Sequence, residues 1–288
     1  MRKVRIVTDS TALFVNPQLV KQYNITVVPT YVYFEEDCYK LGIDIDSEEF
    51  LHRLRYGDVM PRLVAPSEED FVAVYSRLNQ ETTQIVSIHI SAQISDVVQN
   101  AQAASKALLG RCEIAVIDSL TLSAGLGILV ERAAQLTAQH YNLEEIVRDV
   151  RQAIPRLYTV FYVKSMKSIC HHNLISEAQT LLGSMLGVMP FITIEEGQLV
   201  IMEKALNTSQ AVEKLVEFAA EFTDIEQLVI LHHSTTLTDS IRQLQDRLAL
   251  ELPRSNFPTR IYDGSIATFL GPDANGLVIF EAEEEEDL

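Results

Sequence analysis

The sequence is poor in cysteine and in basic residues, and it contains no tryptophan and no long apolar run. Its three cysteines, Cys38, Cys112 and Cys170, lie far apart, and none belongs to a C-x-x-C pair. An odd number of scattered cysteines encodes neither a disulfide framework nor a zinc ribbon, and it favours a reducing cytoplasm. No stretch approaches the roughly 20 apolar residues that span a bilayer, and no signal-peptide core follows the basic start. We therefore expect a soluble cytoplasmic protein.

Acidic residues outnumber basic ones by a wide margin. There are 40 Asp and Glu residues against 23 Lys and Arg residues, which gives a formal net charge of −17 at pH 7. Such a charge repels nucleic-acid backbones and anionic lipid surfaces, so we expect no nucleic-acid partner. Of the 288 residues, 47% are hydrophobic and 22% are charged, which argues against disorder and against a fibre. The length allows two domains or one large α/β domain.

Short apolar runs rich in β-branched residues alternate with helical patterns over the first 155 residues. These runs predict strands at residues 4–7, 26–34, 85–89 and 113–117. Helix starts are indicated at Ser47, Ser67 and Asn142, because acidic residues follow each of them in the manner of a capping box. Such alternation predicts an α/β domain with a mostly parallel sheet and helices on both faces, in three layers.

The pattern changes after Pro155, which ends the last of these helices. Here the sequence predicts a strand at 158–163, an irregular polar stretch at 164–173, an apolar segment at 181–189, a hairpin that turns at Gly197, helices at 209–222 and 236–250, and a strand at 228–231. This predicts an α+β domain with a mixed sheet. The predicted domains are residues 1–155 and 156–288, and the second ends in a solvated acidic tail at 281–288.

Two polar clusters follow predicted strands, where open α/β sheets bind ligands. Ser10 and Thr11 follow the first strand and can either hold a ligand or cap the next helix. Ser91 follows the strand at 85–89 and precedes a helical pattern. Its hydroxyl and the free amides after it suit a ligand carboxylate, although Ser91 can equally be only the helix cap.

Other clusters lack the details of a known catalytic or cofactor site. Gly125 and Gly127 do not form a dinucleotide fingerprint, because Val130 stands where the third glycine belongs. The stretch at 170–173, Cys-His-His-Asn, has metal-binding residue types but no second group at ligand spacing. No G-x-S-x-G, H-E-x-x-H or P-loop pattern occurs. We expect no metal, no cofactor and no catalytic residues; an unrecognised hydrolase or transferase that uses one of these histidines is an alternative.

The order of the motifs resembles the DegV family of bacterial fatty-acid-binding proteins over nearly the whole chain. Three segments are similar to family signatures: Val7-Thr8-Asp9-Ser10-Thr11-Ala12, Ser87-Ile88-His89-Ile90-Ser91 and Val116-Ile117-Asp118-Ser119. Further along, the chain keeps the family's order with Ile175-Ser176, Pro190, Gly197 and Lys204. The resemblance implies the DegV-like architecture of an α/β domain followed by an α+β domain.

In that family a fatty acid lies in an apolar tunnel between the two domains, and hydroxyl side chains hold its carboxylate. Members bind rather than catalyse, and some present the acid to a separate fatty acid kinase. The resemblance therefore implies a long-chain fatty acid or a related lipid as the partner of this chain. Burial of an acyl chain contributes roughly 0.8 kcal/mol per CH₂, so aliphatic walls with few polar contacts suffice for tight binding.

At several positions this chain has an apolar residue where the family has a polar or charged one. Leu63 stands where the family has a hydroxyl side chain, Leu174 where it has an arginine, and Phe269 where it has a histidine. Ser91 keeps its place, but Ala92 follows it. The residues expected to line the ligand site are Ser91, Ala92, Ser10, Thr11, Ser67, Leu63, Leu174 and Phe269.

An ionised carboxylate without its donors costs at least a few kcal/mol to bury. We therefore expect the apolar tunnel to persist with a degenerate carboxylate site, and handover to a kinase to be impaired or absent. The alternative is a member that has lost lipid binding and acts as a protein-interaction or regulatory subunit. Filling of the tunnel by the bulky side chains of Leu63, Leu174 and Phe269 would favour that alternative.

Overall fold

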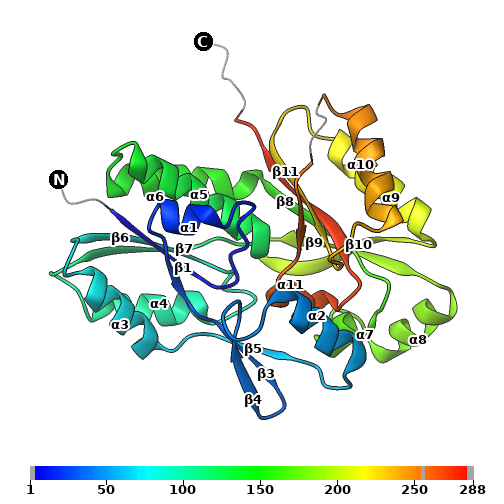
Figure 1. Ribbon diagram of the computed structural model, residues 1–288, viewed down its shortest axis with the longest axis horizontal. Helices are drawn as coiled ribbons and strands as arrows, with labels where there is room; N and C mark the ends of the chain where they lie inside the picture. Colours follow the sequence, from blue (N-terminus) through cyan, green and yellow to red (C-terminus); the bar gives the residue numbers. More distant parts are fainter. Residues whose placement is uncertain (1–3, 254–256, 284–288) are drawn as a thin grey trace.

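The computed structural model describes residues 4–253 and 257–283, which contain three β-sheets (Figure 1). The first sheet has the strand order β2-β1-β6-β7, and all of its neighbouring strands run parallel. Its strands are β1 (Arg5–Asp9), β2 (Thr26–Val28), β6 (Gln84–His89) and β7 (Glu113–Asp118). Helices α5 (Ser123–Ala138) and α6 (Leu143–Ala153) cover one face, and α3 (Glu68–Leu78) and α4 (Val97–Lys106) cover the other. The predicted three-layer arrangement is confirmed.

Local capping signals start three of the helices in the first half. At α3 the Ser67 Oγ accepts from the Asp70 N–H at 3.2 Å, and the Asp70 carboxylate accepts from the Ser67 N–H at 2.9 Å. Asn142 and Glu145 make the same reciprocal pair at α6. The cap of helix α2 (Ser47–Tyr56) is Asp46, whose side chain accepts from the Glu49 N–H, and not Ser47 as the sequence predicted.

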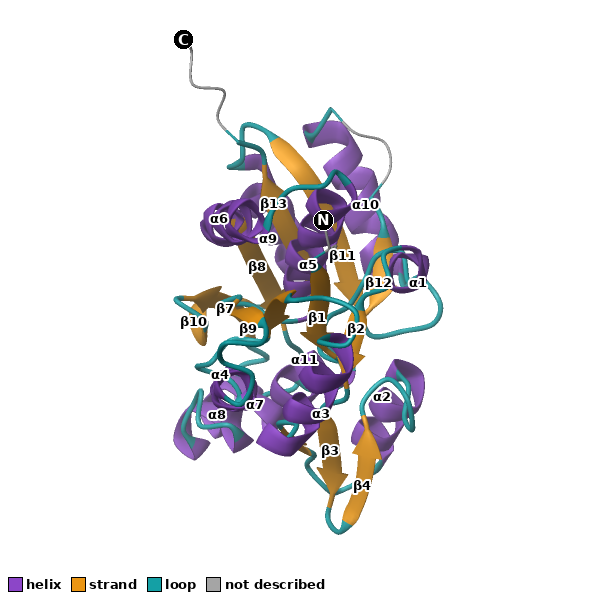
Figure 2. Ribbon diagram, turned by 90° about the vertical axis from the view of Figure 1, so that its left-hand side faces the viewer, coloured by secondary structure: helices purple, strands orange, loops and turns teal. Residues whose placement is uncertain are grey.

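The predicted strand at 26–34 is two strands in two different sheets. After β2, β3 (Tyr31–Phe34) pairs antiparallel with β4 (Asp37–Lys40) and with β5 (Arg62–Val64). Pro29 lies between β2 and β3, and its missing N–H cannot continue a sheet ladder. The small three-stranded sheet therefore projects from the body of the molecule (Figure 2).

The second half is built on a six-stranded sheet with the order β10-β9-β8-β13-β11-β12. Strand β12 runs parallel to β11, and the other neighbours are antiparallel, so the predicted mixed sheet is confirmed. Its strands are β8 (Leu157–Tyr162), β9 (Met189–Glu195), β10 (Gln198–Ala205), β11 (Ile225–His232), β12 (Thr259–Ile261) and β13 (Asn275–Glu281). Helices α9 (Thr208–Ala220) and α10 (Asp239–Glu251) cover one of its faces.

Two predictions for the second half were wrong in detail, and the structure divides a third segment between two elements. The stretch predicted as irregular, 164–173, contains α7 (Lys167–His171), a helix too short to show an apolar period. The apolar segment at 181–189 is divided between α8 (Glu177–Met185) and β9, because Gly187 turns the chain at φ +65°. Glu281 is the last residue of β13 rather than part of a tail, and residues 284–288 of the predicted tail lie outside the described residues.

A single buried apolar cluster joins the two halves. It includes Val7 and Ile88 of the first sheet together with Phe161, Ile192 and Val278 of the second. The 3₁₀ helix η1 (Ile154–Arg156) connects α6 to β8. The division into domains at 1–155 and 156–288 stays a prediction. Among the described residues, no helix is long and apolar enough to cross a membrane.

Candidate functional site

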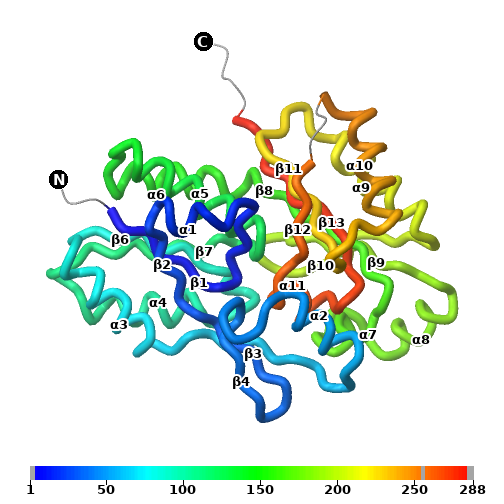
Figure 3. The backbone as a smooth tube through the Cα atoms, in the orientation of Figure 1, coloured from blue at the N-terminus to red at the C-terminus, as the bar shows by residue number. Residues whose placement is uncertain are grey.

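An apolar groove of about 740 Å³ lies between α8 and the hairpin of β9 and β10, and we call it the α8 groove. Figure 3 shows α8 beside α7 at the edge of the second half. The volume falls in the range of small-molecule sites in proteins. All lining residues lie within 166–204, whereas the predicted tunnel lies between the two halves. Most of the walls are apolar and come from Met166, Leu174, Leu182, Val188, Ile201 and Met202.

Helix α8 rests on the protein without burying any of its residues. A capping box between Ser176 and Gln179 starts it, so local hydrogen bonds hold its first turn. Leu182 and Met185 remain 60% and 76% exposed. The helix approaches the body closely at Gly183, where an added Cβ would lie 2.5 Å from the Cε of Met166. Helix α8 therefore covers the groove as a strap with few contacts.

The polar lining of the α8 groove offers one unpaired charge. Gln179 is engaged, because its side-chain oxygen accepts from the Ser176 N–H at 2.9 Å. Glu203 forms an ion pair with Lys214. Lys204 forms no ion pair with any residue that the structure describes. Within the described ranges, no serine, threonine or tyrosine lines this groove.

Ser91, the leading candidate from the sequence, is fully buried and lies outside the α8 groove. Its Oγ donates to the carbonyl oxygen of Gly197 at 2.8 Å and accepts from the Gln93 N–H at 3.2 Å. The next residue, Ala92, is half-buried, and its N–H donates to the Asp118 carboxylate at 3.2 Å. Both residues are thus engaged within the protein, and their contact with a ligand stays a prediction.

The other hydroxyl candidates are also engaged internally. The Oγ of Ser10 accepts from the Thr30 N–H at 2.9 Å, which ties β1 to the start of the small sheet. Thr11 is buried, and its hydroxyl donates to the Asp9 carboxylate at 2.5 Å. Ser67 is exposed and caps α3. The structure does not bring these three hydroxyls together on the α8 groove.

The three bulky candidates lie in different elements. Leu174 lines the α8 groove without filling it. Leu63 in β5 and Phe269 in α11 (Gly264–Leu270) are half-buried and pack on the main core. Phe269 also contacts the ring of His172, with the ring centroids 4.7 Å apart.

The histidines of the 170–173 stretch show no metal site. Burial and the neighbouring His171 lower the pKa of His172, against a hydrogen bond with the backbone of Thr268. The Nε2 of His172 is buried, with no hydrogen-bond partner in the part of the chain that the structure describes. Among the described residues, no group of three or more His, Cys, Asp or Glu side chains is placed to hold a metal.

A buried chain of hydrogen bonds that sequence reasoning missed lies at the carboxyl ends of β1 and β6 in the first sheet. The Nδ1 of His89 lies 3.0 Å from an Asp9 carboxylate oxygen, and its Nε2 lies 2.7 Å from the Oγ of Ser87. The hydroxyl of Tyr75 donates to the same Oγ at 2.8 Å. All four side chains are fully buried. The residue types resemble those of a catalytic triad, but Ser87 is fully buried and its Oγ is engaged by both His89 and Tyr75, as is typical of structural hydrogen bonds in a core.

Asp9 is the charged end of this chain of hydrogen bonds. Burial alone would raise the pKa of Asp9, but the hydrogen bond and charge of His89, with further bonds from Thr11 and the Ile90 backbone, hold the pKa below its usual value. The Asp9 carboxylate also accepts from the Ile90 N–H at 3.1 Å, so it links the ends of β1 and β6. A hydrogen-bonding partner 80 residues away gives no local signal in the sequence.

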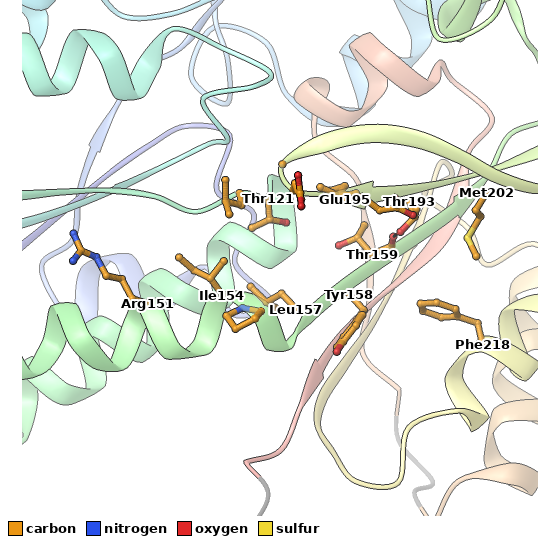
Figure 4. Close-up of a pocket in the computed structure, with 15 residues that line it drawn as sticks. Thr121, Arg151, Ile154, Leu157, Tyr158, Thr159, Thr193, Glu195, Met202 and Phe218 are labelled. Atoms are coloured by element: carbon orange, nitrogen blue, oxygen red, sulfur yellow. Dashed lines mark hydrogen bonds between the residues drawn. The ribbon is translucent and has the colours of Figure 1, made fainter.

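A second groove, of about 660 Å³, lies between the first half and the six-stranded sheet, because Leu120, Thr121 and Arg151 line it from one side and strands β8 and β9 from the other. Thr193, which lines this groove, pairs directly with Val160, so both side chains point to the same face of the sheet. Val160 packs in the cluster beneath α9 and α10, which places this part of the groove on the side of α9. Figure 4 shows Arg151 at one end and Phe218 at the other. Arg151, Glu195 and Glu196 all line it, so its charges are mixed and favour no single ligand class.

Comparisons with known proteins identify the family. The family model described as "Uncharacterised protein, DegV family" matches residues 3–282. A DegV domain-containing protein of Caldanaerobacter subterraneus is 30% identical over 285 residues, which cover 98% of this chain and 99% of the relative.

Solved structures agree with this result. A structure described as fatty acid binding of a DegV family protein from Thermus thermophilus superposes with a TM-score of 0.84 at 27% identity, covering 97% of this chain and 100% of that one. A DegV family protein from Streptococcus agalactiae gives a TM-score of 0.87 at 22% identity, covering 98% and 100%. The fold that the sequence motifs implied is confirmed, and the chain belongs to the DegV family.

Proposed function

We propose that this protein binds a long-chain fatty acid or a related lipid and catalyses no reaction on it. The α8 groove carries this proposal, because it is a cavity of about 740 Å³ with mostly aliphatic walls beneath a helix that buries none of its residues. A relative with 27% identity and a TM-score of 0.84 is described as binding fatty acid. The acyl chain lies in the α8 groove.

The energetics of such a site need few polar contacts. Each buried CH₂ contributes roughly 0.8 kcal/mol, so ten methylenes in the groove contribute about 8 kcal/mol before the cost of ordering the chain is subtracted. Leu174 forms part of the wall and leaves the groove open. An open groove favours lipid binding over the alternative of a member that has lost its ligand and acts as a regulatory subunit.

We also propose that this protein does not present a carboxylate to a fatty acid kinase. The support is that the hydroxyls of Ser91, Ser10 and Thr11 are engaged by Gly197, Thr30 and Asp9 in turn. For its location we propose the cytoplasm, since Cys38, Cys112 and Cys170 are all free thiols.

The test is native mass spectrometry of protein purified from a bacterial host, followed by denaturing extraction and identification of lipids by gas chromatography. We expect about one fatty acid per chain. A chain that carries no lipid and takes up no added palmitate would overturn the proposed function. In that case the regulatory-subunit alternative would take its place.

A further inference from the structure

Arg55, near the carboxyl end of α2, reaches from the first half to two loops of the second half. Its Nη2 lies 2.9 Å from the carbonyl oxygen of Pro272, 3.3 Å from a carboxylate oxygen of Asp273 and 3.1 Å from the Nδ1 of His233. Pro272 and Asp273 lie just before β13, and His233 directly follows β11. Figure 1 shows α2 beside α11, against which it packs. One guanidinium nitrogen thus joins α2 to both loops.

The loop before β13 is held in place by the hydroxyl of Tyr262. This hydroxyl donates to the carbonyl oxygen of Gly271 at 2.8 Å and accepts from the N–H of Ala274 at 3.1 Å. The Tyr262 side chain is fully buried. Because these two bonds fix the chain on both sides of residues 272–273, the carbonyl and carboxylate acceptors there have a fixed position relative to the core.

The contact between Arg55 and His233 requires a neutral imidazole. Arginine has only N–H donors and stays charged in proteins, so the Nδ1 of His233 must be the acceptor. A neutral imidazole with its proton on Nε2 can accept at Nδ1, whereas a protonated imidazole carries a hydrogen on both nitrogens. Protonation of His233 therefore removes one acceptor from the guanidinium and places a second positive charge beside it.

The surroundings of His233 oppose this protonation. Burial, Arg55 and Lys164 hold the pKa of His233 below its usual value, against the attraction of Asp273 for a charged imidazole. The neighbouring His232 is buried, and its own pKa is lowered by burial and by His233. Once protonated, His233 would share the single carboxylate of Asp273 with two other cations.

We propose that Arg55 and His233 form a pH-sensitive latch between the two halves: neutral His233 accepts from Arg55 and holds α2 on the second half, and protonation of His233 releases α2. The contribution of the latch is fully present above the ordinary histidine pKa of about 6.5, and it is lost as the pH falls through the lower pKa of the closed state. Arg55, His233 and Asp273 do not line the α8 groove, so this inference does not depend on the proposed lipid binding.

The experiment follows amide hydrogen exchange of the full chain from pH 8 to pH 5, corrected for the pH dependence of the intrinsic rate. The wild type should lose protection at residues 53–57 and 271–274 as the pH falls below about 6.5. His233→Asn should keep its protection, because the side-chain oxygen of asparagine remains an acceptor at every pH. The control His52→Asn makes the same change at an exposed histidine of α2 and should lose protection as the wild type does.

An NMR titration of the His233 imidazole tests the contact itself. Arg55→Gln should raise the pKa of His233, because it removes the neighbouring positive charge, and Asp273→Asn should lower it. The matched control Arg53→Gln removes the same charge from α2 at a residue that pairs with Glu49 instead, and it should leave the pKa of His233 unchanged.

Three results would overturn the latch. Equal loss of protection in acid in the wild type and in His233→Asn would show that another group controls the contact. Full protection of the wild type at pH 5 would show that protonation does not release α2. A pKa of His233 that is the same in Arg55→Gln as in the wild type would show that the two side chains do not interact.

Discussion

The hydroxyl of Ser91 donates a hydrogen bond to the carbonyl oxygen of Gly197 at 2.8 Å, across 106 positions of the chain. The bond joins the loop after β6 to the turn between β9 and β10, so it fastens the second half to the first. Gly197 has φ +82°, and a Cβ there would lie 2.3 Å from the Ser91 Oγ. Only a glycine allows the backbone at position 197 to come this close to the Ser91 side chain. The hydrogen bond from Ser91 therefore helps to hold the β9–β10 hairpin against the first half.

The substitution Ser91→Ala should reduce the free energy of unfolding by about 1 to 3 kcal/mol, because it leaves the buried Gly197 carbonyl without its donor. Palmitate affinity should stay unchanged, since Ser91 does not line the α8 groove. Urea unfolding and calorimetry of the same preparation measure both quantities. Weaker palmitate binding with unchanged stability would restore Ser91 as a head-group ligand, as the sequence predicted.

The substitution Gly197→Ala should destabilise the protein for two separable reasons. The positive φ alone costs an alanine about 1 to 2 kcal/mol, and the clash with the Ser91 Oγ adds to this cost. In a Ser91→Gly background the clash is removed while the backbone strain remains. The double variant should therefore be more stable than the sum of the two single effects predicts. Strict additivity in urea unfolding would show that the two residues do not touch.

The substitution Asp9→Asn should reduce stability by about 2 kcal/mol at pH 7, because the buried carboxylate accepts hydrogen bonds from His89, Thr11 and Ile90. The folded state lowers the pKa of Asp9, so its contribution is fully present above the unfolded value of about 4. It is lost as the pH falls through the folded value. Urea unfolding from pH 7 to pH 3 should show the two proteins converging in acid.

The matched control for this pH series is Asp58→Asn, which removes the same charge from an exposed position. Its unfolding free energy should follow the wild type at every pH. A gap between Asp9→Asn and the wild type that stays constant down to pH 3 would contradict the role of the Asp9 charge. The carboxylate would then act only through its shape and hydrogen-bond geometry.

The sequence predicted the features that short stretches of chain encode. Ser67 and Asn142 carry their capping partners three residues on, so both helix starts were correct. The alternation of strand and helix patterns was enough to predict the parallel sheet of the first half. Pro29 was a local signal that the strand at 26–34 breaks, but the partner sheet of β3 could not be derived from it.

The site was harder to predict, because distant residues decide which hydroxyls are free. Ser91 stood at the expected place after a strand, yet Gly197 engages it from the second half. Leu174 was expected at the ligand, and it does line the α8 groove.

The two leucines in the middle of α8 give the sharpest test of where the acyl chain lies. Leu181 and Leu182 are 63% and 60% exposed, but only Leu182 lines the α8 groove. Since leucine and glutamine have similar helix propensities and neither side chain is buried, both Leu→Gln variants should keep the stability of the wild type. Leu182→Gln should bind palmitate about fivefold more weakly, because it removes apolar wall from the groove, whereas Leu181→Gln should bind as the wild type does.

Calorimetry with palmitate on both leucine variants makes this comparison at equal exposure and equal chemistry. A loss of affinity confined to Leu182→Gln places the chain between α8 and the hairpin. Equal losses in the two variants would contradict the proposed groove, because the outer apolar face of α8 would then carry the binding. Since that face is in contact with solvent, a chain bound there would lie outside the α8 groove, and the groove residues Met166 and Val188 would have no part in binding it.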